Sequence, residues 1–217
     1  MMEKTKQYTH IIWDWNGTLF NDVAWGVEVV NKMLEKRSLK IFNNIDEYRD
    51  VFGFPIKDYY IDVGFDFEKE PFEQLAVEFI ELYHFNKSGN CQLNQGGEAV
   101  LAVINQKGIN QVILSASKKE NLLLQLEEFD ISHYFNEILG ISDIYAKSKI
   151  DIGLDYINRN NITKGLLIGD TIHDYEVATA LGMDCILVTT GHQSKKRLLK
   201  CGVPVIECLT QIVEYLD

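Results

Sequence analysis

One segment near the N-terminus constrains the fold of this chain more than any other. An apolar run ends on Asp14 and a turn-forming Gly17 follows at once, in the sequence His-Ile-Ile-Trp-Asp-Trp-Asn-Gly-Thr-Leu of residues 10–19. Such a run before a glycine is typical of a buried β-strand. In an open α/β sheet, ligands bind at the carboxyl ends of the strands, where the strand-to-helix loops open. The pattern therefore makes Asp14 a candidate site residue.

Beyond residue 89, short apolar segments alternate with amphipathic ones. We expect strands at 111–115, 137–139, 165–168, 185–188 and 205–206, with helices between them. This alternation favours an α/β fold with a mainly parallel sheet. Because parallel crossovers are right-handed, helices should cover both faces and the carboxyl ends of the strands should share one edge. Asp14, Ser115 and Asp170 would meet at that edge.

Residues 21–88 have a different pattern of apolar residues. Their apolar spacing predicts helices near 23–34, 46–52, 56–63 and 72–85, and Pro71 with acidic neighbours is typical of a helix start. The sequence therefore predicts an all-helical segment between the first strand and the rest of the sheet.

Composition narrows the class of protein. The chain has 217 residues, of which 46% are hydrophobic and 24% charged, as in a soluble globular protein of one α/β core with an addition. No apolar run approaches the roughly 20 residues of a membrane span. The N-terminus has no stretch typical of a signal peptide, so we expect a cytoplasmic location.

The net charge of −11 argues against nucleic acid or a membrane surface as a partner, since both require a basic face. The basic cluster at 195–200 is interpreted as the solvated face of a helix. The four cysteines lack metal-ligand spacing and are interpreted as small, reduced, apolar residues. The sequence does not predict an oligomeric state.

Four motifs together carry a family resemblance. With Asp14 and its glycine turn, Ser115 after the second apolar strand, Lys149 before a helix, and Gly-Asp-Thr-Ile-His-Asp at 169–174, the chain resembles the haloacid dehalogenase-like hydrolases, in particular the phosphoglycolate phosphatase-like branch. The resemblance implies a Rossmann-like core of residues 1–20 and 89–217, with a helical cap at 21–88. Two strands link core and cap in such proteins, so the cap could close over the site.

The resemblance also implies roles for individual residues. Asp14 would be the nucleophile that forms an aspartyl-phosphate. Phosphate would be bound by Ser115, the backbone next to it at Ala116, Thr18 and Lys149, and the substrate would be a small phosphorylated metabolite. A phosphate dianion beside an ionised carboxylate requires a hard cation, which favours Mg²⁺. Its implied ligands are Asp14, the backbone carbonyl of Asn16, Asp170 and, from farther away, Asp174.

Asn16 departs from the family pattern. Phosphatases of the family usually have a second aspartate at this position, which protonates the leaving alcohol and then activates water. An amide cannot transfer that proton, and loss of a positioned acid typically costs about 10² to 10⁴ in rate. Asn16 is therefore a candidate catalytic position with an altered role, and the expected turnover is slow or the substrate unusual.

Three alternatives stay open at this stage. Lys147 competes with Lys149 as the lysine of the third motif. Lys57 resembles the Schiff-base lysine of phosphonoacetaldehyde hydrolases, which also lack the second aspartate. The missing acid further admits a pseudoenzyme that binds Mg²⁺ and a phosphorylated ligand without turnover.

Overall fold

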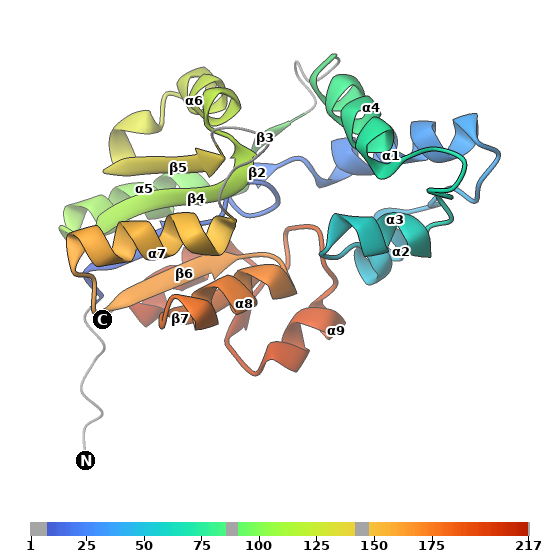
Figure 1. The fold of residues 1–217 in the computed structure, drawn as a ribbon. Coiled ribbons are helices and arrows are strands. Elements are labelled where there is room, and N and C mark those ends of the chain that lie inside the picture. Colours follow the sequence, from blue (N-terminus) through green and yellow to red (C-terminus); the bar gives the residue numbers. More distant parts are fainter. Residues whose placement is uncertain (1–7, 86–90, 142–147, 217) are drawn as a thin grey trace.

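A computed structural model describes residues 8–85, 91–141 and 148–216. Six parallel strands form the central sheet in the order β5-β4-β1-β6-β7-β8 (Figure 1). Their bounds are β1 His10–Trp13, β4 Asn110–Lys118, β5 Glu137–Ile141, β6 Gly165–Gly169, β7 Asp184–Val188 and β8 Val205–Ile206. All five strands expected beyond residue 89 are present, and the parallel α/β sheet is confirmed.

The first strand lies in the middle of the sheet. β1 pairs with β4 on one side, where Ile12 is opposite Val112, and with β6 on the other, where Ile12 is opposite Leu167. Alternate residues of β1 point to opposite faces of the sheet, as the period of a strand requires. Ile11 and Trp13 belong to one core cluster and Ile12 to the other. The carboxyl end of β1 is thereby fixed at the centre of the sheet edge.

Helices cover both faces. Helix α5 (Gly97–Gln106) and the 3-10 segment η3 (Leu209–Tyr215) pack on the face of Ile11, while α7 (Lys149–Asn160) and α8 (Ile172–Ala180) pack on the face of Ile12. Helix α6 (Lys119–Glu128) follows β4 directly. Strand β4 runs three residues past Ser115, but its pairing with β5 shifts between Leu114 and Lys118. This irregularity leaves the Ser115 segment at the site although the strand continues.

Four helices form a separate packed unit, here called the helical insert: α1 (Val23–Lys36), α2 (Ile45–Val51), α3 (Ile56–Asp62) and α4 (Phe72–Phe85). They have a hydrophobic cluster of their own and lie beyond the carboxyl end of the sheet in Figure 1. The insert is joined to the sheet through two short antiparallel strands, β2 (Phe20–Asn21) and β3 (Gln92–Leu93). The expected boundary at 88/89 falls outside the described residues.

The basic cluster near the C-terminus differs from the expectation. Helix α9 spans only Lys195–Leu198, and 3-10 structure follows it. Arg197 does not lie on a solvated face, because its guanidinium donates hydrogen bonds to the backbone carbonyls of Arg49 and Phe52 in the helical insert. Arg197 thus provides hydrogen-bond donors for carbonyls at the end of α2. The expectation of a solvated helix face was therefore wrong for this residue. No disulfide bond joins the four cysteines within the described part of the chain.

Candidate active site

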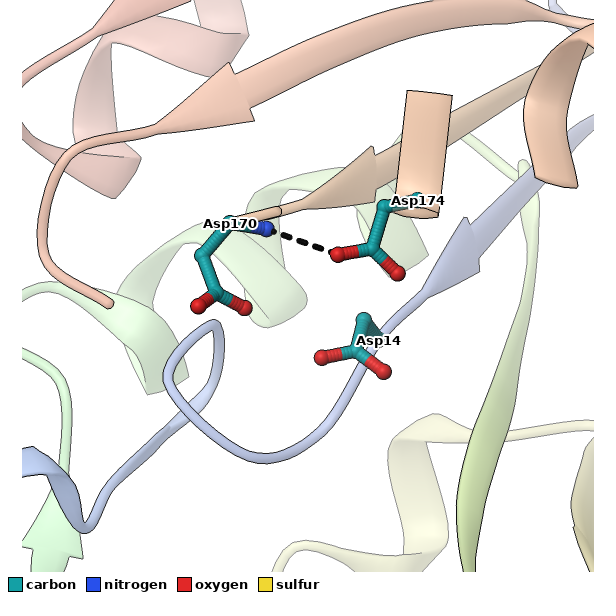
Figure 2. A group of neighbouring side chains, drawn as sticks. All are labelled: Asp14, Asp170 and Asp174. Carbon is teal, nitrogen blue, oxygen red and sulfur yellow. Dashed lines mark hydrogen bonds between the residues drawn. The ribbon is translucent and has the colours of Figure 1, made fainter. Parts of the chain in front are cut away.

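Three carboxylates and one lysine form a buried cluster at the carboxyl edge of the sheet. Figure 2 shows Asp14 at the end of β1, Asp170 after β6 and Asp174 at the start of α8, around a common space. One carboxylate oxygen from each of the three residues lies within 4.8 Å of the other two. The Nζ atom of Lys149 donates to Asp14 Oδ1 and to Asp174 Oδ1, both at 2.6 Å. The sequence motifs therefore meet in one place.

Asp174 is held in place by its surroundings. Its Oδ2 atom accepts hydrogen bonds from the backbone amides of Asp170 and Thr171 and from the Thr171 hydroxyl. Thr171 is the N-cap of α8 and accepts from the Asp174 amide in return, which forms a capping box. With Lys149 on Oδ1, both carboxylate oxygens of Asp174 have hydrogen-bond partners, and these contacts connect Asp174 to Lys149 and to the Asp170 loop.

Asp170 sits in a cradle that only glycine permits. Its Oδ1 atom accepts from the Thr18 hydroxyl at 2.8 Å, and its Oδ2 atom accepts from the His192 amide at 2.7 Å. A Cβ atom on Gly17 would lie 2.4 Å from Asp170 Oδ2, and one on Gly191 would lie 2.0 Å from it. Two loops thus close around this carboxylate, and a side chain on either would displace it.

The cluster carries more negative charge than Lys149 balances. Burial raises the pKa of Asp14 despite the opposing charge of Lys149, and burial with the nearby carboxylates raises the pKa of Asp170. The Asn16 backbone carbonyl accepts no hydrogen bond within the described part of the chain. Two carboxylates and a carbonyl oxygen at an electron-rich, buried point match the donor set that a hard divalent cation prefers.

The Asn16 side chain is fixed by three neighbours. Its Nδ2 atom donates to Asp22 Oδ2 at 2.8 Å and to the Tyr83 hydroxyl at 3.2 Å, and its Oδ1 atom accepts from Ser117 Oγ at 2.8 Å. Four donors in all converge on the buried Asp22 carboxylate: Asn16 Nδ2, Tyr83 Oη, the Gly17 amide and His192 Nε2. An amide at position 16 can donate a hydrogen bond to the Asp22 carboxylate, whereas an ionised carboxylate at this position could not.

His192 and Asp22 form a buried ion pair beside this amide. His192 Nε2 lies 3.1 Å from Asp22 Oδ1, and His192 Nδ1 lies 2.8 Å from the Tyr48 hydroxyl. Burial opposes protonation of the imidazole, but the Asp22 charge and hydrogen bond outweigh it and raise the pKa of His192 to about 9. The pKa of Asp22 is lowered, since its partners outweigh burial. Both ring nitrogens are occupied by these contacts.

A cavity of about 430 Å³ lies between the cluster and the helical insert. Its floor includes Asp14, Asn16, Ser115, Lys149 and Asp170. Its opposite wall comes from the insert and is largely aromatic and aliphatic: Phe52, Phe54, Ile56, Tyr59, Phe72 and Phe79. This volume falls in the usual range of small-molecule sites.

The remaining predicted residues occupy different positions. Ser115 is buried, accepts from the Ser117 amide at 3.1 Å, and lines the cavity together with exposed Ala116. Thr18 does not line the cavity, because its hydroxyl is directed at Asp170. Lys149 occupies the position expected of the third-motif lysine, and Lys147 lies outside the described residues.

Lys57 does not line the cavity. Its side chain is half-exposed on α3, 3.8 Å from Glu73 and over the Phe72 ring. The structure therefore places this lysine away from Asp14, where the Schiff-base alternative would need it.

Sequence reasoning missed Asp22, Ser117 and His192. His192 comes after the apolar strand β7 and next to Gly191. The rule that ligands bind at the carboxyl ends of strands, which made Asp14 a candidate, therefore also applied to His192. Asp22 directly precedes α1, as a helix cap would, but its side chain accepts no capping hydrogen bond from that helix. Its partner His192 is 170 residues away in the chain, and no local pattern encodes such a contact.

Comparison with known proteins assigns the family. The chain belongs to the haloacid dehalogenase-like hydrolases, whose family model matches residues 11–188. No curated protein matches the chain at a significant level. No helix among the described residues is long and apolar enough to span a membrane.

Solved structures share the fold over nearly the whole chain. A predicted phosphatase from Clostridium acetobutylicum superposes with a TM-score of 0.76 at 22% identity, over 96% of this chain and 97% of that one. A haloacid dehalogenase-like hydrolase from Streptococcus pneumoniae gives 0.81 at 17% identity, over 97% and 99%. A predicted phosphoglycolate phosphatase from Haemophilus somnus gives 0.76 at 17% identity, over all of both chains. These structures share the fold of the chain, and one of them is described as a predicted phosphoglycolate phosphatase.

Proposed function

We propose that the chain is a Mg²⁺-dependent phosphatase of a small phosphorylated metabolite and acts through an aspartyl-phosphate at Asp14. One observation carries the proposal: a buried carboxylate at the central strand end faces a cavity while Lys149 holds one of its oxygens at 2.6 Å. Mg²⁺ on Asp14, Asp170 and the Asn16 carbonyl would offset the negative charge of the phosphate and of the cluster.

In the proposed reaction, individual residues have distinct roles. An Asp14 oxygen forms a bond to phosphorus as the ester P–O bond breaks, and the leaving oxygen departs with the bonding electrons. Lys149 orients Asp14 and supplies positive charge. The Ser115 hydroxyl and the backbone at Ala116 face the phosphoryl oxygens. Water then attacks phosphorus, which releases inorganic phosphate and restores Asp14.

The helical insert would act as the cap over this reaction. Its aromatic wall faces the cluster across the cavity and would exclude water when a substrate is bound. The domain boundaries at residues 20/21 and 88/89, the cytoplasmic location, and the expectation of neither a nucleic-acid nor a membrane partner stay predictions from the sequence.

A panel of phosphate esters tests the proposal, including 2-phosphoglycolate because of the structural relatives. We expect Mg²⁺-dependent phosphate release that falls by about 10⁴-fold or more in Asp14→Ala, as when a nucleophile is removed. The exposed Asp62→Asn variant serves as the matched control and should keep the rate. Release that persists in Asp14→Ala would exclude Asp14 as the nucleophile.

Asn16 favours one second candidate, a binding protein without turnover. Its amide carries no transferable proton and is fixed by Asp22 and Ser117. Absence of phosphate release from every ester of the panel, together with Mg²⁺ binding measured by calorimetry, would favour this candidate over the phosphatase.

A further inference from the structure

The cavity wall opposite the cluster limits what the substrate can carry besides its phosphate. This inference rests on the proposed phosphatase function and concerns its substrate. Phe52, Phe54 and Tyr59 line the wall together with Phe72, Phe79 and Ile80. Aromatic walls bind flat apolar groups well, because rings pack in offset-stacked or edge-to-face arrangements.

Positive charge on this wall is nearly absent. Among the described residues that line the cavity, the helical insert contributes no lysine or arginine. Its one basic lining residue is His84, whose Nε2 atom is 3.1 Å from the Asn121 amide nitrogen. The lysines belong to the core: Lys149 is paired with two aspartates, and Lys118 lies at the exposed end of β4. A second anionic group on the substrate would find no cationic partner in the aromatic wall.

The groups around Asn16 cannot protonate a leaving oxygen either. Asn16 has no acidic proton. His192 uses both ring nitrogens, on Asp22 and Tyr48, and the Tyr83 hydroxyl donates to Asp22 at 2.6 Å. The protons of this network are thus directed at Asp22 or shared with Tyr48. A leaving group that departs without assistance suits this arrangement.

We propose that the substrate is the phosphate monoester of a phenol, with its uncharged ring against the aromatic wall of the helical insert. A phenol has a pKa of about 10, like the tyrosine side chain. An alkyl alcohol is closer to water, at about 16. When Asp14 bonds to phosphorus and the ester bond breaks, the phenolate keeps the electron pair and takes its proton later from solvent. The aromatic wall and the amide at position 16 thereby select the same chemical class.

Two esters that differ by one methylene separate ring binding from leaving-group chemistry. Phenyl phosphate and benzyl phosphate both place a ring in the cavity, but only phenyl phosphate releases a phenol. We expect kcat/KM for phenyl phosphate to exceed that for benzyl phosphate by about 100-fold or more, because a missing acid costs about 10² to 10⁴. Benzyl phosphate should in turn exceed 2-phosphoglycolate, whose carboxylate faces the apolar wall.

The outcomes are distinct. Benzyl phosphate or 2-phosphoglycolate turned over as fast as phenyl phosphate would overturn the aryl assignment and leave the phosphatase intact. Absence of phosphate release from every ester would overturn both. Release from phenyl phosphate that Asp14→Ala abolishes, with the expected order of rates, would support both.

A pair of variants tests the wall itself. Phe79→Ala should raise KM for phenyl phosphate about tenfold with a smaller change in kcat, since the ring loses apolar contact area. Phe67→Ala removes an aromatic residue of the same insert that packs on Phe72 but does not line the cavity, and should leave KM within twofold. An equal change in both variants would contradict a ring-binding wall.

Discussion

At the scale of single residues, Asn16 is explained by its neighbour. Its Nδ2 atom lies 2.8 Å from Asp22 Oδ2, and the pKa of Asp22 is lowered by its hydrogen-bond donors and by His192. In the family pattern a carboxylate occupies position 16. In this chain, a carboxylate at position 16 would lie at hydrogen-bond distance from the Asp22 carboxylate, and neither group could donate to the other while both are ionised. The amide at position 16 is therefore one member of a polar network that also contains Asp22, Tyr83 and His192.

Asn16→Asp tests this network. Two carboxylates at hydrogen-bond distance raise the pKa of one of them, so the folded state binds a proton that the unfolded chain releases near pH 4. The variant should be less stable than the native protein by about 1–3 kcal/mol at pH 8. Because the penalty comes from a raised pKa, it should grow as pH rises and vanish near pH 4.

Thermal unfolding at pH 4.5 and pH 8 measures the difference. Asn21→Asp, at the neighbouring half-buried position, is the matched control and should show no such trend. A loss of stability that is equal at both pH values would contradict like-charge contact at Asp22.

The sequence predicted the charged centre of the site but not its surroundings. Asp14 and Asp170 were found because each follows an apolar strand, and Lys149 through the family resemblance, as the candidate lysine nearest a helix. Asp22 and His192 act through a contact between distant segments, which no spacing rule reports. Thr18 was assigned to substrate, whereas its hydroxyl holds Asp170.

At the scale of elements, one arginine links separate parts of the helical insert in addition to its hydrophobic cluster. Arg37 at the end of α1 donates to Glu70 and Glu78, at 2.8 and 2.6 Å from its Nη2 atom, and its Nη1 atom donates to the Met33 carbonyl at 2.9 Å. The Arg37 side chain is only 12% exposed. It therefore connects α1 to α4 and to the loop before α4.

Arg37→Met should lower the free energy of unfolding by about 1–2 kcal/mol at pH 7. The loss is smaller than for a fully buried charged hydrogen bond, because the ion pairs of Arg37 are partly solvated. The hydrogen bond from Arg37 lowers the pKa of both glutamates below 4.5. Because the folded-state pKa is lowered, this stabilisation is fully present above the pKa of a glutamate in the unfolded chain. It is lost as pH falls through the folded-state pKa. The deficit of the variant should therefore shrink at pH 3.

Denaturant unfolding at pH 7 and pH 3 checks this expectation. Lys69→Met, which removes an exposed lysine of the insert paired with Asp66, should change stability by less than about 0.5 kcal/mol. An Arg37→Met deficit that persists at pH 3 would assign the effect to lost packing instead.

Element types were more predictable than element ends. The helices of the insert follow their apolar spacing, and the five later strands appear within a few residues of the expected positions. The two-residue strands β2 and β3 have no sequence signature, since they exist only through pairing with each other. The end of β4 was misjudged because a register shift, and not a turn, follows Ser115.

At the scale of the whole molecule, the cluster of like charges would couple stability to the proposed Mg²⁺. Asp14, Asp170 and Asp174 oppose one another in a buried place, with Lys149 as their only cationic partner at hydrogen-bond distance among the described side chains. A bound cation removes this repulsion in the folded state alone, because the unfolded chain does not bring the three residues together.

Mg²⁺ should therefore raise Tm. At a free concentration of 100 times Kd, linkage gives about 2.7 kcal/mol. At roughly 2–4 °C per kcal/mol for a chain of this size, the rise is about 5–10 °C. Asp170→Asn should abolish the rise and Asp62→Asn should retain it. An equal rise in both variants would place Mg²⁺ elsewhere.

The position of β1 in the sheet has a consequence for the order in which the molecule can form. Thr18 and Asp170 are 152 residues apart in sequence, and Asp14 and Lys149 are 135 apart. The helical insert, by contrast, is one continuous stretch near the N-terminus. A chain growing from its N-terminus thus completes the sequence of the insert well before the partners of β1 exist. A product that stops after α6 contains Asp14 and Ser115 but lacks Lys149, Asp170 and His192. During synthesis of this stretch, the sequence of the insert is complete before that of the sheet, and Asp14 is among the residues that wait longest for their partners.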